Sequence, residues 1–288
     1  MLCCSEVVMI MKWLVVILIT IPMHSFSKES IMVPVLIDDE TINLEMHIFK
    51  PSGNGPFPTL ILNHGSTGTG KEPEQFRQIW EFGSLRRFFL TKDYAVIRIF
   101  RRGRGQSEGI YDEGFSANRA EGYSCDPNLS IPGADRGIQD IKAAMEVIQK
   151  MPYVDAENMF MGGWSRGGIL SVIYAGKFPN QVKGVINFVG GWVNAHLCAT
   201  AAEIHEELFQ RGASYPKVTL WLYGNYDPYY SLSHSRSNFE AFKRAGGKGE
   251  FYEFQALPAS SGHEIIFFDG IWDSVLEKYL NQSMENIN

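Results

Sequence analysis

The chain alternates between short apolar runs and longer stretches in which apolar residues recur at helical spacing. Apolar runs of strand length, bounded by glycine, proline or polar residues, occur at residues 59–62, 94–100, 158–161, 183–189, 218–223 and 250–254. Helical patterns occupy the intervals, at residues 74–91, 138–148, 168–178, 199–211, 235–244 and 269–280. Because strands alternate with helices, the pattern predicts an α/β fold with a mostly parallel sheet and helices on both faces.

Two further strands are expected at the start of the sheet. Residues 31–37 and 42–49 alternate loosely between apolar and polar positions, and the acidic residues 38–40 separate them. This pattern predicts an antiparallel hairpin, which brings the expected sheet to about eight strands. The sequence shows no internal repeat or low-complexity tract, so residues 28–288 are expected to form one domain with small cap insertions.

A glycine-flanked serine carries the most specific chemical pattern. The apolar run 158–161 leads into the turn Gly-Trp-Ser-Arg-Gly at 163–167, and a helical stretch follows. Flanking glycines permit a turn too tight for side chains, which thrusts the serine hydroxyl outward, so we interpret Ser165 as a nucleophile. Residues 105–109 also fit G-x-S-x-G, but no helical pattern follows them, and Ser107 is interpreted as a turn serine.

Candidate partners for Ser165 follow in the order acid, then histidine. The strand pattern 218–223 leads into a loop that holds Asp227, and the pattern 250–254 leads through a glycine-containing loop to His263. A histidine can activate a serine hydroxyl and an aspartate can orient the histidine, so this order predicts a catalytic triad. Taken singly, the aspartate could cap a turn and the histidine could lie on the surface.

The loop after the third expected strand is a candidate for binding an oxyanion. The run 59–62 passes into the segment 63–68, which contains two glycines. In a strand–turn–helix of this kind, one N–H comes from the residue after the nucleophile, here Arg166, and another from this loop, here Ser66. His64 is expected to support the loop by hydrogen bonding; a second catalytic base is the alternative, disfavoured because His64 precedes the serine in the chain.

The chain resembles an α/β-hydrolase over about residues 31–282. The loop 63–66, the arginine-rich turn 101–109 and the turn 163–168, with Asp227 and His263, are similar to the dienelactone-hydrolase-like and prolyl-oligopeptidase-like branches. True dienelactone hydrolases use a cysteine nucleophile, so the serine argues against dienelactone as the substrate. The large propeller domain of prolyl oligopeptidases does not occur in this sequence.

The resemblance implies a serine hydrolase that cleaves a carboxylic ester through an acyl-enzyme, without a cofactor or metal. A peptidase or amidase is the alternative, and a non-catalytic binding module is the alternative from another class. Trp164, Trp192 and Tyr229 are candidate pocket residues that suit an apolar or aromatic group, or else packing residues. The expected partner is a small ester or amide. Nucleic acid is not expected as a partner, because the net charge of the chain is −6.

Four arginines lie close together in the sequence: Arg98, Arg101, Arg102 and Arg104. They are expected to pair with nearby acids, for which Glu108, Asp112 and Glu113 are the candidates. The alternative is a positive wall near the site that favours an acidic substrate.

Residues 1–27 are predicted to be a secretory signal peptide. An apolar core at 13–21 follows a lysine, and Ser25 and Ser27 place small side chains at the two positions that a signal peptidase reads. The core is shorter than the ~20 residues of a spanning helix, so we expect a secreted or periplasmic protein. An uncleaved membrane anchor is the alternative, and Met11 is an alternative start to Met1.

Two cysteines remain after the expected leader. Cys125 and Cys198 both follow strands whose carboxyl ends share one edge of a parallel sheet, so an exported chain is expected to join them by a disulfide. The bridge would tie two cap segments over the pocket, with the helix 199–211 in the second. A metal site of His196, Cys198 and His205 is the rival interpretation.

Overall fold

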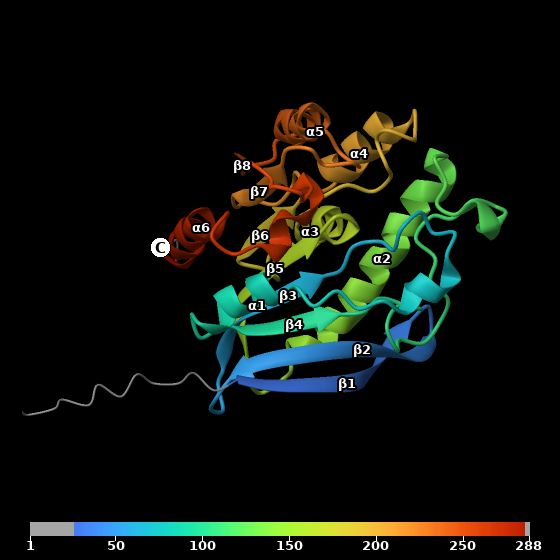
Figure 1. The fold of residues 1–288 in the computed structure, drawn as a ribbon. Helices are drawn as coiled ribbons and strands as arrows, with labels where there is room; N and C mark the ends of the chain where they lie inside the picture. The colour runs from blue at the N-terminus through green and yellow to red at the C-terminus, as the bar shows by residue number, and fades with distance from the viewer. Residues whose placement is uncertain (1–25, 286–288) are drawn as a thin grey trace, which may run out of the picture.

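The computed structural model describes residues 26–285, which fold around one eight-stranded sheet (Figure 1). The strands are β1 (Phe26–Ile37), β2 (Glu40–Pro51), β3 (Phe57–Asn63), β4 (Ala95–Ile99), β5 (Val154–Trp164), β6 (Gly184–Phe188), β7 (Thr219–Gly224) and β8 (Gly249–Phe254). Their order across the sheet is β1-β2-β4-β3-β5-β6-β7-β8. β2 is antiparallel to β1 and β4, and all other neighbours are parallel. The predicted α/β fold is confirmed.

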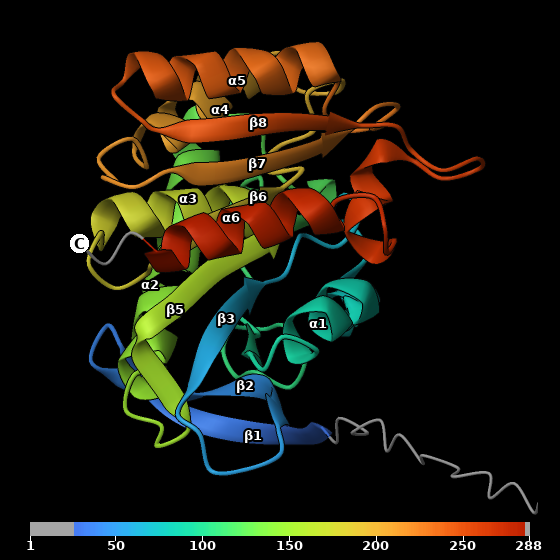
Figure 2. The same ribbon diagram turned by 90° about the vertical axis from the view of Figure 1, so that its left-hand side faces the viewer.

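Helices cover both faces of the sheet. Within residues 26–285 the α-helices are α1 (Gly83–Leu90), α2 (Pro127–Ile148), α3 (Arg166–Lys177), α4 (Ala201–Gln210), α5 (Leu232–Arg244) and α6 (Asp273–Glu285). Three short 3-10 helices are η1 (Pro73–Arg77), η2 (Arg119–Glu121) and η3 (Gly262–Phe267). Figures 1 and 2 show α1 and α6 on one face and α2 and α3 on the other. The helix expected in the cap, α4, instead packs against α2, α3 and α5.

The inner strands explain the uninterrupted apolar runs of the sequence. Every residue of β4, β6 and β7 is buried. Helices cover both faces of these strands, so no position along them can be polar and solvated. β1, at the edge of the sheet, alternates between exposed and buried residues over its second half, as a strand with one solvated face does.

The opening hairpin closes through a two-residue turn. Ile37 pairs with Glu40, and the intervening Asp38 and Asp39 have positive φ angles of 50° and 65°. Positive φ at both central residues is the conformation that matches the twist of two-residue hairpins, and aspartate tolerates it better than most residues. The structure therefore contains the predicted hairpin, with strands longer than expected.

The helix expected at residues 74–91 is divided. It becomes η1 and α1, because Phe82 adopts a φ of 44° and its ring stacks on Phe267 with 5.5 Å between centroids. Burial of this ring, which is 1 % exposed, offsets the cost of the left-handed backbone. The break brings Trp80 toward the same aromatic cluster, where its ring lies 5.2 Å from that of Trp164.

The helix expected at residues 138–148 is longer than its apolar spacing indicates. α2 begins at Pro127, directly after Asp126, whose carboxylate accepts a hydrogen bond from the Asn128 N–H. A capping aspartate followed by proline is a favoured helix start. The extra turns carry the N-terminus of α2 to the end of the sheet where the candidate site lies.

The predicted signal peptide falls mostly outside the described residues, which begin with Phe26 and Ser27 at the start of β1. Between residues 26 and 285, no helix has the length and apolar character needed to cross a membrane.

Close backbone packing fixes the turn between β5 and α3. A Cβ atom on Gly167 would lie 2.1 Å from the carbonyl oxygen of Asn63 in β3, and one on Gly163 would lie 2.2 Å from the carbonyl oxygen of Gly167. Neither distance is possible between atoms that are not bonded to each other, so both positions require glycine.

We expect Gly167→Ala to lower the free energy of unfolding by about 3 kcal/mol, because the added methyl group must push β3 and α3 apart. Gly83→Ala is the control, since its Cβ would meet nothing within 4 Å; it should change stability by about 1 kcal/mol or less. Urea unfolding measures both. Equal stability of the two variants would contradict this account of the turn.

Candidate active site

Ser165 sits at the junction of β5 and α3 in a backbone conformation that few non-glycine residues adopt. Its φ and ψ are 56° and −121°, and its N–H donates to the carbonyl of Phe188 in β6 at 3.0 Å. The residue is 4 % exposed and lines a cavity of about 670 Å³. Strained backbone of this kind is maintained only where the surrounding structure holds it, commonly at functional sites.

Asp227 and His263 contact each other, and His263 lines the same cavity as Ser165. Asp227 follows β7, His263 lies in η3 after β8, and Nδ1 of the imidazole is 2.8 Å from Oδ2 of the carboxylate. The other carboxylate oxygen accepts the N–H groups of Tyr229 at 2.7 Å and Tyr230 at 3.0 Å. The carboxylate is thereby fixed, and Nε2 is the imidazole nitrogen left to exchange a proton.

Trp164 connects the turn to the histidine. Its indole Nε1 donates to the carbonyl of His263 at 2.7 Å, and the two rings are 5.0 Å apart. Ser165 and His263 both line the cavity. The described residues contain no hydrogen bond between the serine hydroxyl and the imidazole, and bonds of this kind commonly shorten when substrate binds.

The loop after β3 lies against the serine. A Cβ atom on Gly65 would lie 2.8 Å from the ring of Trp164 and 3.1 Å from the Cβ of Ser165. Within the described chain, the N–H groups of Ser66 and Arg166 donate to no protein acceptor. The structure therefore brings together the two donors expected at an oxyanion site.

His64 supports this loop from within the core. It is 1 % exposed, Nδ1 donates to the carbonyl of Gly65 at 2.8 Å, and Nε2 accepts the N–H of Arg101 at 3.2 Å. Burial lowers the pKa of the imidazole well below its usual range, and the guanidinium groups of Arg101 and Arg104 lower it further. A neutral imidazole satisfies both hydrogen bonds at neutral pH.

Ser107, the serine of the second G-x-S-x-G, is fully buried. Its hydroxyl donates to the carbonyl of Phe100 at 2.7 Å and accepts the N–H of Glu45 at 2.8 Å. Both hydrogen bonds hold a turn, in agreement with the interpretation from sequence.

The arginine cluster is buried and pairs mostly with other acids than expected. Arg101 pairs with Glu113, whereas Arg102 pairs with Asp140 at 2.6 Å. Arg104 donates to the carbonyl of Gly65 at 3.0 Å. Of the three candidate acids, Glu113 pairs with the cluster as expected, whereas Glu108 and Asp112 do not. Glu108 accepts from Asn43, and Asp112 pairs with Arg119.

Glu113 is the carboxylate at the centre of this region. It is 2 % exposed, pairs with Arg101, and lies 3.6 Å from Nη1 of Arg166. Burial alone would raise the pKa of Glu113, but the guanidinium groups of Arg101 and Arg166 outweigh burial and hold the pKa below its ordinary value. The group is therefore ionised at neutral pH.

Aromatic side chains dominate the cavity wall. The three candidate pocket residues, Trp164, Trp192 and Tyr229, all line it. Further aromatic residues in the wall are Trp80, Tyr123, Tyr230 and Phe267. Sequence patterns did not identify Trp80, Tyr123 and Phe267, because no local pattern shows which residues of distant segments reach the cavity. Their position depends on long-range packing.

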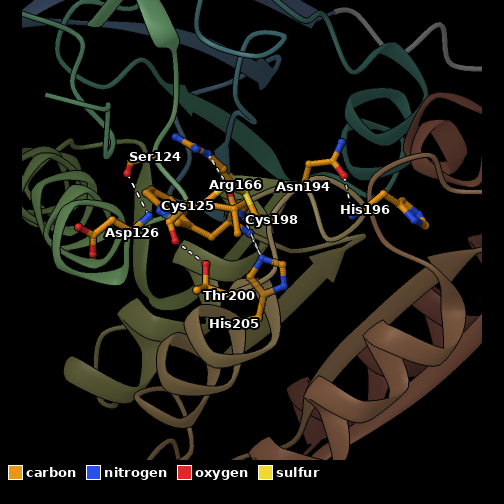
Figure 3. The surroundings of a disulfide bond; sticks show 11 residues. Ser124, Cys125, Asp126, Arg166, Asn194, His196, Cys198, Thr200 and His205 are labelled. Carbon is orange, nitrogen blue, oxygen red and sulfur yellow. Dashed lines mark hydrogen bonds between the residues drawn. A yellow bond between two sulfur atoms is a disulfide. The ribbon is translucent and has the colours of Figure 1, made fainter. Parts of the chain in front are cut away.

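A disulfide joins the two segments that follow β4 and β6, residues 111–126 and 190–200, which we call the cap segments. Cys125 is bonded to Cys198, with 5.3 Å between Cα atoms, and both cysteines line the cavity (Figure 3). The disulfide prediction is thus confirmed, and the rival metal site is wrong. His205 instead uses Nε2 to accept the N–H groups of Trp192 and Val193.

Comparisons with known proteins identify relatives in sequence and in fold. The family model for the prolyl oligopeptidase family matches residues 133–235. Proline iminopeptidase of Neisseria gonorrhoeae is 27% identical over 138 residues, which cover 48% of this chain and 34% of the relative. The match therefore spans about a third of the curated relative's length.

Solved structures extend the likeness to almost the whole chain. The Pyrococcus furiosus esterase Pf2001 superposes with a TM-score of 0.61 at 17% identity, over 88% of this chain and 90% of the esterase. A prolyl endopeptidase superposes with a TM-score of 0.59 at 16% identity, over 92% of this chain and 40% of the endopeptidase. The chain has the α/β-hydrolase fold. This fold explains why the loops that carry Ser165, Asp227 and His263 lie at one edge of the sheet, since the carboxyl ends of its parallel strands share that edge.

We expect Glu113→Gln to lower the free energy of unfolding by about 3–5 kcal/mol at neutral pH, because it leaves two buried guanidinium groups without their anion. Stability from a carboxylate with a lowered pKa is complete above its ordinary value of 4.5 and is lost as the pH falls through the folded-state pKa. The difference from wild type should therefore shrink only below about pH 4.5.

The control for this variant is Glu277→Gln, because Glu277 is exposed and pairs with Lys92 at the surface. Its effect should stay within about 1 kcal/mol. Chemical denaturation of all three proteins from pH 3 upward provides the comparison. A Glu113→Gln protein as stable as the control variant would show that this carboxylate does not hold the region together.

Proposed function

We propose that the chain is an exported serine hydrolase that cleaves a carboxylic ester. The observation that carries the proposal is the 2.8 Å hydrogen bond between Asp227 and His263 beside a serine held in a left-handed turn. A structural aspartate–histidine pair would not require a strained serine and two unused N–H donors in the same cavity.

The proposed reaction has two steps. His263 takes the proton of the Ser165 hydroxyl as its oxygen attacks the ester carbonyl, and it then gives that proton to the departing alcohol. Asp227 orients the imidazole and stabilises its charged form. Water, activated by the same histidine, attacks the acyl-enzyme and releases the acid.

Backbone N–H groups stabilise the negative charge that develops on the carbonyl oxygen. Ser66 and Arg166 supply these donors, and one such donor typically contributes about 3 kcal/mol to the transition state. The loop carrying Ser66 is fixed by His64 and by Arg104, which both bind the carbonyl of Gly65. A donor that is already oriented needs no reorganisation during the reaction.

Hydrolysis of a peptide or amide is the second candidate. It is supported by the match to the prolyl oligopeptidase family and by the proline iminopeptidase relative. The two activities use the same residues, so the leaving group accepted in the cavity distinguishes them. Aryl esters would be cleaved by an esterase, and aminoacyl anilides would be preferred by a peptidase.

We expect a fluorophosphonate to label the mature protein once, and Ser165→Ala to abolish both labelling and ester hydrolysis. Ser107→Ala, with a folded state checked by circular dichroism, should keep its label because that hydroxyl is fully buried. Intact mass spectrometry and a paired ester and anilide assay measure these outcomes. A folded wild-type protein that resists labelling would support a binding module instead.

Export through the predicted signal peptide forms part of the proposal. The disulfide supports it, because such bonds persist in oxidising compartments. The mass of protein recovered outside the cytoplasm should correspond to a chain that starts near Lys28 with Cys125 and Cys198 joined. Recovery of a chain that retains residues 1–27 would contradict cleavage.

A further inference from the structure

The side chain of Arg166 lies near the disulfide and contacts both cap segments (Figure 3). It is 1 % exposed, Nε donates to the carbonyl of Trp192 at 2.8 Å, and Nη1 donates to the carbonyl of Glu113 at 2.7 Å. Its guanidinium carbon lies 3.7 Å from the centre of the Tyr123 ring and 4.4 Å from that of Trp192. The group is thus oriented before any ligand arrives.

One end of this guanidinium group remains unused. Within residues 26–285, Nη2 of Arg166 makes no hydrogen bond, although a guanidinium group carries five N–H donors. Arg166 and both rings that enclose it, Tyr123 and Trp192, line the cavity that contains Ser165. Arg166 directly follows the proposed nucleophile, and we infer that its unused Nη2 donors face this cavity.

The charge around this wall is not balanced. Glu113 is the carboxylate that pairs with both Arg101 and Arg166, and Arg104 has no ion pair among the described residues. Three buried guanidinium groups thus face one carboxylate. Buried positive charge is weakly screened and attracts an anion into the cavity.

The remaining charged residues of the cavity do not offset this excess. Lys71, Glu121 and Glu264 line it, but all three are exposed, so water screens them. The buried part of the wall combines aromatic rings with a single cation. Such a pocket fits an acyl chain that is apolar along its length and negatively charged at its end.

We propose that the acyl group of the substrate carries a carboxylate and that Arg166 binds it through Nη2. The substrate class is then the monoester of a dicarboxylic acid. This inference rests on the proposed ester hydrolysis and adds the chemical identity of the acyl part. If Arg166 only ties the cap segments to the turn, acidic and neutral acyl groups will be cleaved alike.

The test compares substrates of matched size. The p-nitrophenyl monoesters of succinate, glutarate and adipate are assayed against p-nitrophenyl butyrate, pentanoate and hexanoate. A charged hydrogen bond predicts a preference for one of the acidic esters of about 10- to 100-fold in kcat/KM. A wild-type enzyme that cleaves the neutral esters equally well or better would overturn the inference.

Arg166→Gln removes the charge and keeps the backbone N–H. We expect the preference to fall to about one, with KM for the acidic ester rising much more than KM for the neutral one. Arg119→Gln is the matched control, because Arg119 also stacks on an aromatic ring of the first cap segment but does not line the cavity. An Arg166→Gln enzyme that keeps the wild-type preference would exclude Arg166 as the binding group.

If the Arg166→Gln protein does not fold, a second measurement on the wild-type protein tests the inference. Glutarate should slow fluorophosphonate labelling of wild-type Ser165 at concentrations where pentanoate has no effect, and added salt should weaken the protection. Equal protection by both acids would overturn the inference. If the protein is labelled and cleaves neutral esters without preferring acidic ones, only this inference is wrong. If the protein is not labelled at all, the proposed function is wrong as well.

Discussion

The buried carboxylate of Glu113 holds together three loops that the sequence separates widely. It pairs with Arg101, which follows β4, and with Arg166, which begins α3. Arg101 in turn donates to the carbonyl of His64 in the loop after β3. The candidate oxyanion donors and the nucleophile turn are therefore fixed relative to one another by one anion. Without it, two buried cations would repel each other at the centre of the site.

The residues of the candidate triad could be located from sequence because each follows its own strand. Ser165, Asp227 and His263 come after apolar runs, and parallel strands place their carboxyl ends at one edge. Local pattern and global topology agree at these positions, so the order along the chain was sufficient. The disulfide partners could be named for the same reason, since both cysteines follow strands of this sheet.

The remaining parts of the site depend on contacts between distant segments. Trp80 reaches the cavity only because Phe82 breaks an expected helix in order to stack on Phe267, 185 residues further along the chain. The arginine pairs follow the same rule. Acids near the cluster in sequence were the expected partners, whereas the fold pairs Arg102 with Asp140 in α2. No local sequence spacing predicts the position of Trp80 or the arginine pairs, because tertiary packing determines both.

The order of strands in the sheet has a consequence for how the protein folds. From β5 to β8 each strand pairs with the next in the chain, and these strands carry all three residues of the proposed triad. The loop that bears Ser66 follows β3. The pairing of β3 with β5 joins residues that are far apart in the chain, such as Asn63 and Gly163. Pairing over so long a separation is slow, because loop closure costs entropy before the contact is made. The second half of the sheet can therefore bring the residues of the proposed triad together early, whereas the candidate oxyanion loop is placed only when β3 pairs with β5.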